Sequence, residues 1–145
     1  MVNFIDSFNQ GMSAAQKAIA NKDEIDSVID ALSEQLLQAS GGKIKISIAE
    51  KATPLFAMFA ASAEDLLARR KRWSVVASNP LASYQPKELA EWKFDENGYP
   101  CRLITTETEM FCEDREALED ALNKLLSAPG TGKKLKAVME QKPKE

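Results

Sequence analysis

Apolar residues recur at helical spacing through the first 40 residues of the chain, where they form two stripes. The stripes consist of Phe4, Ile5, Phe8, Met12, Ala15 and Ile19, then Ile25, Val28, Ile29, Leu32 and Leu36. At about 100° per residue, the second stripe is rotated by roughly 110° from the first. One straight helix therefore cannot present both stripes to the same surface. Either the helix breaks, or its two halves contact different things.

The sequence Asn-Lys-Asp-Glu at residues 21–24 has the Asn-x-x-Glu form of a capping box. It favours a break, with one helix over about residues 3–20 and a second over about 22–39. Ser40, Gly41 and Gly42 then end the second helix, since glycine readily takes the conformation that closes a helix.

Strict alternation of apolar and polar residues predicts a half-exposed strand at 43–50, with three isoleucines on one face. A second strand is predicted at 73–77. Residues 88–106 read as a hairpin around Asp-Glu-Asn-Gly, where Gly98 supplies a positive φ, and the second strand of this hairpin can run on with a bend into 108–112. Residues 53–61 are interpreted as a loop or short strand, and 62–70 as a short helix.

The clearest helix is predicted at about 114–127, with Asp114 as its cap. A further helix is expected at about 132–140, capped by Thr131, before a frayed tail at 141–145. This order predicts an α+β fold: an antiparallel sheet of about four strands with N-terminal and C-terminal helices packed on one face. We expect a single domain over 1–145, of which 1–40 is a helical N-terminal segment.

Composition agrees with a single domain, because 145 residues at 44% hydrophobic suffice for one core. The first residues do not form the positively charged stretch followed by an apolar run that would indicate export. The apolar run at 55–63 is too short to cross a bilayer. We therefore expect a cytoplasmic protein without membrane contact. Its two cysteines, Cys101 and Cys112, are interpreted as buried reduced thiols, which could pair only if neighbouring strands brought them together.

The chain contains no histidine, which removes the commonest general base and the commonest metal ligand. Two cysteines cannot make a zinc site by themselves, so we expect no metal and no cofactor. The segment 129–134, Pro-Gly-Thr-Gly-Lys-Lys, is similar to part of a phosphate-binding loop. That loop would need glycine at the preceding position 127, which is Ser127, and Ser or Thr at position 134, which is Lys134. The carboxylates between 107 and 120 suit the start of a helix better than acid–base chemistry. We therefore expect that the protein is not an enzyme.

Charge alternates along the chain, with net values of −4 for residues 1–42, +5 for 43–87, −8 for 88–120 and +4 for the remainder. Such alternation has two possible interpretations. Segments of opposite charge attract one another in the fold, or the folded protein carries opposed positive and negative surface patches. One basic cluster adjoins an aromatic residue, as nucleic-acid contacts require. It consists of Arg69, Arg70, Lys71, Arg72 and Trp73, with Lys43 and Lys45 as candidates on an adjacent strand.

The preferred hypothesis is a small non-enzymatic protein that binds another protein, as adaptors, inhibitors and mobile-element accessory proteins do. A surplus apolar face must be covered by something, so we expect self-association, as a homodimer, through the first stripe. The residues concerned are Phe4, Phe8, Met12 and Ile19. A two-helix hairpin that buries both stripes is an open alternative, and nucleic-acid binding through Arg69–Trp73 is the competing function.

Overall fold

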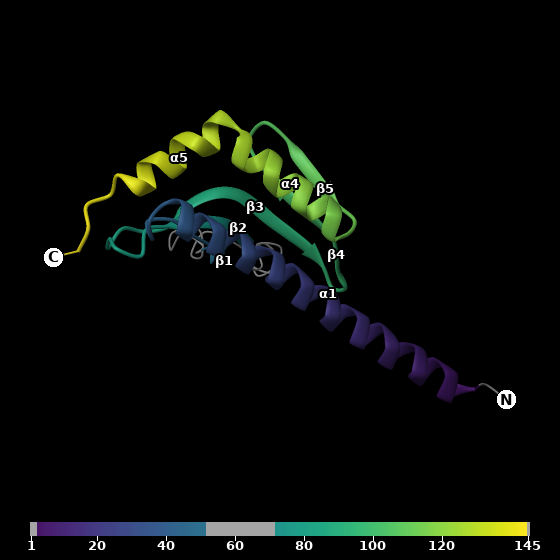
Figure 1. The fold of residues 1–145 in the computed structure, drawn as a ribbon. Coiled ribbons are helices and arrows are strands. Elements are labelled where there is room, and N and C mark those ends of the chain that lie inside the picture. The colour runs from purple at the N-terminus through teal and green to yellow at the C-terminus, as the bar shows by residue number, and fades with distance from the viewer. Residues whose placement is uncertain (1–2, 52–71, 145) are drawn as a thin grey trace, which may run out of the picture.

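A five-stranded antiparallel sheet carries helices on one face (Figure 1). The computed structural model describes residues 3–51 and 72–144. Within them the elements follow in the order α1 (Phe4–Ala39), β1 (Lys45–Lys51), β2 (Arg72–Ser78), β3 (Lys87–Asp95), β4 (Gly98–Ile104), β5 (Glu109–Cys112), α4 (Arg115–Ser127) and α5 (Pro129–Met139). Strands that are consecutive in the chain are neighbours in the sheet. The predicted α+β class is confirmed.

The predicted hairpin is β3 and β4, joined by a tight turn in which Gly98 has a φ of +87°. The sheet has one strand more than expected because the chain does not run on from β4 with a bend. It reverses again at residues 105–108, where the hydroxyl of Thr105 accepts hydrogen bonds from the backbone N–H groups of Glu107 and Thr108. This local turn makes β5 a separate strand, antiparallel to β4.

The N-terminal segment is one continuous helix of 36 residues, not two helices with a break at 21–24. The Asn21 side chain is turned toward the β3–β4 turn, since its amide NH2 group donates to the backbone carbonyl of Asn97 at 2.9 Å. Without a competing cap, the helical backbone hydrogen bonds continue through this region. The start and end of α1 are as predicted, with Asn3 as the N-cap and positive φ at Gly41 and Gly42.

The core lies between the sheet and the helices and is built from alternate strand residues together with one face of each helix. The second stripe of α1 supplies Ile25, Val28 and Ile29, each at most 6% exposed. The sheet and the C-terminal helices supply Ile44, Ile46, Val75, Ala77, Leu89, Ala90, Trp92, Cys101, Leu103, Cys112, Leu118, Ala121, Leu122, Leu125 and Val138.

The C-terminal helices differ from the prediction only at α5. Asp114 caps α4 by accepting from the backbone N–H of Ala117 at 2.9 Å, as expected. However, α5 begins at Pro129 rather than near 132, because proline at the first helical position has the right φ and lacks an N–H to satisfy. Thr131 is therefore buried inside the helix and is not its cap.

The last residues, expected to be frayed, contact the loop that follows β2. Pro143 bridges to Ala82, and the backbone N–H of Lys144 donates to the carbonyl of Leu81 at 2.6 Å. The interpretations of 53–61 and of 62–70 fall outside the described residues.

Candidate interaction surface

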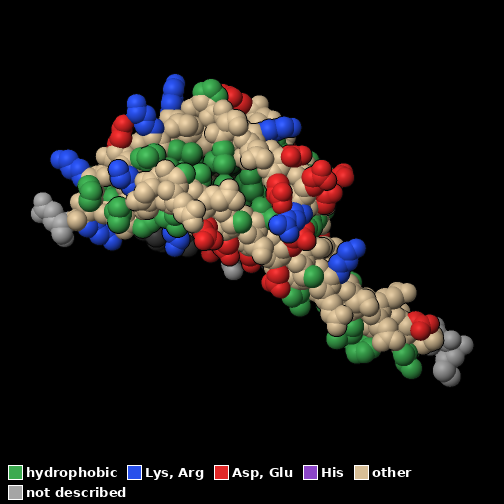
Figure 2. All heavy atoms as spheres, in the orientation of Figure 1, with side chains coloured by type: hydrophobic (Ala, Val, Ile, Leu, Met, Phe, Trp, Pro, Cys, Tyr) green, Lys and Arg blue, Asp and Glu red, His purple; other side chains and the backbone are tan. Residues whose placement is uncertain are grey.

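The N-terminal half of α1 extends away from the sheet and from the other helices (Figure 1). Its apolar residues are exposed to solvent: Phe4 is 75% exposed, Phe8 65%, Met12 49% and Ile19 61%. Ile5, in the same stripe, is 71% exposed. Hydrophobic side chains gather along one side of this projecting helix in Figure 2. We call the surface formed by these five residues the α1 apolar face.

Helix geometry explains why the α1 apolar face is not buried in the same chain. The buried stripe of α1 begins at Ile25 and faces the sheet. The exposed stripe is rotated by roughly 110° from it around the helix axis. It would therefore face to the side of the sheet even if the sheet extended beneath the N-terminal half of α1. The alternative in which a helical hairpin buries both stripes is excluded, because α1 does not turn back on itself.

The projecting half of α1 is almost free of charge. Between residues 3 and 21 only Asp6 and Lys17 are charged. At about 100° per residue, both lie on the side of the helix opposite the α1 apolar face. The residues that flank the face are glycine, serine, alanine, asparagine and glutamine. A partner on this face therefore meets apolar and neutral groups.

An aromatic groove continues the α1 apolar face onto the body of the protein. Its volume is about 250 Å³, and it is lined by Lys22, Ile25, Asp26, Ile48, Trp73, Trp92, Phe94 and Gly98. Lys22 and Asp26 lie on the continuation of the exposed stripe by helical spacing. The rings of Trp73 and Phe94 stand 6.4 Å apart at an interplanar angle of 60°, and Phe94 is 44% exposed.

Two hydrogen bonds fix α1 at the point where it leaves the body. The first is the bond from Asn21 to Asn97 in the β3–β4 turn. In the second, the Tyr99 hydroxyl donates to Oε1 of Glu24 at 2.8 Å. Burial, followed by this bond to a carboxylate, raises the pKa of Tyr99 above its ordinary value. The direction of the projecting helix is thus set by contacts with the hairpin.

The basic cluster is only partly within the described residues, since Arg69, Arg70 and Lys71 lie outside them. Arg72 is exposed at the first position of β2. Trp73 follows it and points to the opposite face of the sheet, as successive strand residues do, where its ring contacts Phe94. Lys45 pairs with Ser78, at the other end of β2 from Arg72. The structure therefore does not bring Arg72, Trp73 and Lys45 together on one surface.

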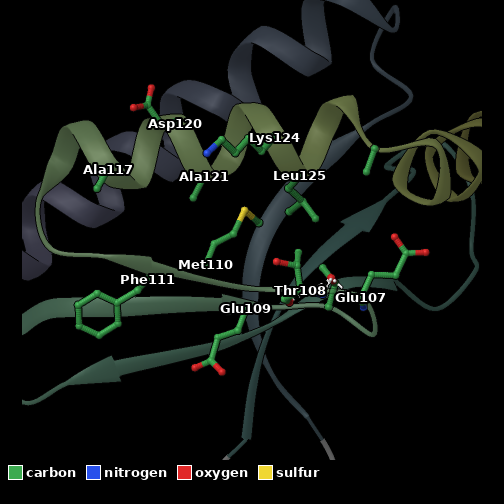
Figure 3. A pocket seen from close by; sticks show the side chains of 12 residues that line it. Glu107, Thr108, Glu109, Met110, Phe111, Ala117, Asp120, Ala121, Lys124 and Leu125 are labelled. Atoms are coloured by element: carbon green, nitrogen blue, oxygen red, sulfur yellow. Dashed lines mark hydrogen bonds between the residues drawn. The ribbon is translucent and has the colours of Figure 1, made fainter.

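A second groove, of about 530 Å³, separates β5 from α4 (Figure 3). Met110 points from β5 toward Ala121 and Leu125 of α4, whereas Glu109 points away from the helix (Figure 3). Glu109 is paired with Arg102 at 2.8 Å. The carboxylates that line the groove are exposed, and the lining contains neither a cysteine nor a histidine. Its other functional groups are the Lys124 amine and the hydroxyls of Thr105 and Thr108, and the Thr105 hydroxyl is engaged in the β4–β5 turn.

Within residues 3–51 and 72–144, no group of three or more acidic, cysteine or histidine side chains is arranged to hold a metal ion. None of the helices in these ranges is both long enough and apolar enough to cross a membrane. Comparison of the chain with protein-family models, with curated proteins and with solved structures gave no match.

Sequence reasoning identified Phe4, Phe8, Met12 and Ile19, which the structure places together on one exposed face. It missed the aromatic groove, because the residues that line it come from α1 and from four strands, β1 to β4, and lie far apart in the sequence. The rotation of the two stripes of α1 was the one available signal, since it implies a surface to the side of the sheet.

Proposed function

We propose that this is a non-enzymatic cytoplasmic protein that acts by binding protein, and that it self-associates through the α1 apolar face. The observation that carries the proposal is the exposure of five large apolar side chains on a helix that projects from the body. Water around such a surface is released when a partner covers it, which favours association. The same surface offers no chemistry that would suit a substrate.

The area of the α1 apolar face suits a dimer. An aromatic side chain presents roughly 150–250 Å², so the two phenylalanines, at 75% and 65% exposure, leave about 250 Å² in contact with water. Ile5, Met12 and Ile19 bring the apolar area to about 500 Å² for one copy and about 1,000 Å² for two. Stable specific interfaces begin near this size.

A second copy of the chain is the occupant that this surface fits best. A nucleic acid would need several cations, and the projecting half of α1 has only Lys17. A charged peptide would find no opposite charge beside the stripe. A helix with the same apolar stripe and the same neutral flanks would match the surface on both counts.

An antiparallel arrangement places large side chains against complementary ones. If Met12 of one copy faces Ala15 of the other, the same register sets Phe8 against Ile19. Phe4 then lies near Lys22 of the partner copy, at the edge of the aromatic groove formed with Trp73 and Phe94. This arrangement also places the two bodies at opposite ends of the helix pair.

Sedimentation velocity of the full chain over a range of concentrations tests the proposal. We expect a dimer that dissociates on dilution. The Phe8→Glu variant should be monomeric throughout, because pairing would bury an unpaired carboxylate. The matched control is Ser13→Glu, which puts the same charge on the opposite side of the same helix and should leave the dimer intact.

A full chain that stays monomeric at all concentrations would refute self-association. Equal weakening of the dimer by Phe8→Glu and Ser13→Glu would refute the assignment to the α1 apolar face. Salt-dependent binding of the monomer to single- or double-stranded nucleic acid, lost when Arg70 and Arg72 are reversed in charge, would instead favour the competing function.

A further inference from the structure

Cys101 and Cys112 occupy directly opposite positions on the neighbouring strands β4 and β5. Both are completely buried, with 0% exposure. Opposite residues of an antiparallel pair have Cα atoms about 4.5–5.5 Å apart, which lies within the range that a disulfide bond spans. The sheet thus supplies the condition that the sequence left open, since neighbouring strands bring the two thiols together.

The two thiols interact with each other. A hydrogen bond between them, followed by burial, raises the pKa of Cys101. The same bond from Cys101 lowers the pKa of Cys112, because it stabilises the Cys112 thiolate. The Cys112 thiol also lies 3.9 Å from the backbone carbonyl of Met110. While the two strands are paired, the bond from Cys101 favours the thiolate of Cys112, and the thiolate is the nucleophilic form.

Access to this buried pair depends on β5. The strand has four residues and stands at the end of the sheet order, so only one of its edges is paired with another described strand. Short terminal strands open locally at lower free energy than the middle of a sheet. Such an opening exposes Cys112 while β4, still paired with β3, keeps Cys101 in place.

We propose that Cys101 and Cys112 are an oxidation site, at which hydrogen peroxide converts the two thiols into a disulfide bond within one chain. The proposal does not depend on self-association, because neither residue belongs to the α1 apolar face, and it shares with the proposed function only the cytoplasmic location. Disulfides that form inside a reducing compartment are transient and sense oxidants. The closed ring would fix β5 to β4 and so hold the start of α4, whose cap Asp114 follows two residues later.

The reaction takes place in two steps. The Cys112 thiolate attacks one peroxide oxygen; the O–O bond breaks, a sulfenic acid forms, and the other oxygen leaves with a proton as water. The sulfur of Cys101 then attacks the sulfur of Cys112, and the S–OH bond breaks as the S–S bond forms. The departing hydroxide takes the Cys101 proton as a second water. Two electrons pass from the two sulfurs to one hydrogen peroxide molecule.

Peptide mapping of the folded full chain after treatment with hydrogen peroxide tests the proposal. Arg102 separates the two cysteines, so trypsin places Cys101 in the peptide 94–102 and Cys112 in the peptide 103–115. After free thiols are alkylated, digestion without reductant should yield these two peptides joined, with a mass lower by two hydrogens. The oxidised protein should also melt roughly 5–10 °C higher than the reduced protein.

Matched single variants assign the roles of the two thiols. In Cys101→Ala, peroxide should still consume the Cys112 thiol, whereas in Cys112→Ala the Cys101 thiol should stay available to alkylation. The reverse pattern would overturn Cys112 as the attacking thiol. Circular dichroism of each variant shows whether it is folded, and the mapping of the unaltered chain does not depend on either variant.

Three results would overturn the proposal as a whole. The first is that peroxide oxidises exposed methionines of the folded protein but leaves both cysteines as free thiols, which are then alkylated. The second is a linked product that appears only when urea unfolds the chain. The third is linkage between copies, seen as mixed isotope patterns when labelled and unlabelled protein are oxidised together.

Discussion

The side-chain amide of Asn21 donates a hydrogen bond of 2.9 Å to the backbone carbonyl of Asn97. This bond joins the middle of α1 to the β3–β4 turn, across 76 residues of sequence. It lies where the helix stops covering the sheet and begins to project. The hairpin therefore holds the helix that carries the α1 apolar face.

Gly98 allows this close approach, so Gly98→Ala should destabilise the protein. A Cβ atom there would lie 2.9 Å from the Cβ of Asn21 and 3.3 Å from the backbone nitrogen of Lys22, at a φ of +87°. The strain and the clash together should cost about 2–4 kcal/mol, measured by urea unfolding. Gly132→Ala, inside α5 with no atom within 4 Å, should instead be neutral or stabilise by up to about 1 kcal/mol. Equal effects of the two substitutions would contradict this account of the turn.

Because of Tyr99, we expect the protein to become less stable at alkaline pH. Its pKa is raised in the folded protein, whereas an unfolded tyrosine titrates near 10. Below about pH 10 both states keep the proton, and the contribution of Tyr99 is fully present. As the pH rises further, the unfolded chain releases its proton first, so the free energy of unfolding falls.

The variant Tyr99→Phe should therefore show a shallower fall in stability above pH 10. At neutral pH it should be less stable by about 1 kcal/mol, because the hydrogen bond to Glu24 is lost. Tyr84→Phe is the control, since Tyr84 is 55% exposed. Chemical unfolding at a series of pH values gives both quantities. A Tyr99→Phe curve parallel to that of the unaltered protein would show that Tyr99 does not cause the effect.

Ser33 connects the buried half of α1 to β1. Its hydroxyl accepts a hydrogen bond of 3.0 Å from the backbone N–H of Ile46, and the residue is 8% exposed. Ser33→Ala should cost about 1–2 kcal/mol, because it leaves a buried N–H group without this partner. Ser13→Ala, on the exposed half of the same helix, should be neutral or slightly stabilising. Urea unfolding that gives equal free energies for both variants would count against the role of Ser33.

The projecting half of α1 should be dispensable for folding. A chain that begins at Ala20 keeps Asn21 and the buried stripe, so its free energy of unfolding should change by less than about 1 kcal/mol at a concentration where the full chain is monomeric. The same truncation should abolish the dimer in sedimentation velocity. Loss of the cooperative transition would mean that residues 1–19 belong to the core.

The pattern of residues was enough to predict the local elements. The alternation of isoleucines from Ile44 to Ile48, the turn at Gly98 and the cap at Asp114 each act over a few neighbouring residues. Such signals depend on backbone geometry and on the nearest side chains, so they can be read along the chain. The same reasoning found the exposed stripe of α1, because helical spacing alone decides which side chains share a face.

Where the prediction failed, a contact from a distant part of the chain decided the outcome. The capping-box pattern at Asn21 did not break the helix, and the Asn21 side chain is turned toward Asn97, to which its NH2 group donates. Local helical signals cannot register a contact so far away in the sequence. The same limitation explains why the aromatic groove was missed, since its lining joins α1 with four strands.

The sequence by itself determined the α+β class, most element positions and the apolar stripe at Phe4 to Ile19, because these depend on local periodicity. Only the tertiary structure decided that α1 is continuous, that the stripe remains uncovered and that Cys101 faces Cys112. The physical reason is that strand register and long-range hydrogen bonds result from packing the whole chain. No single segment contains that information.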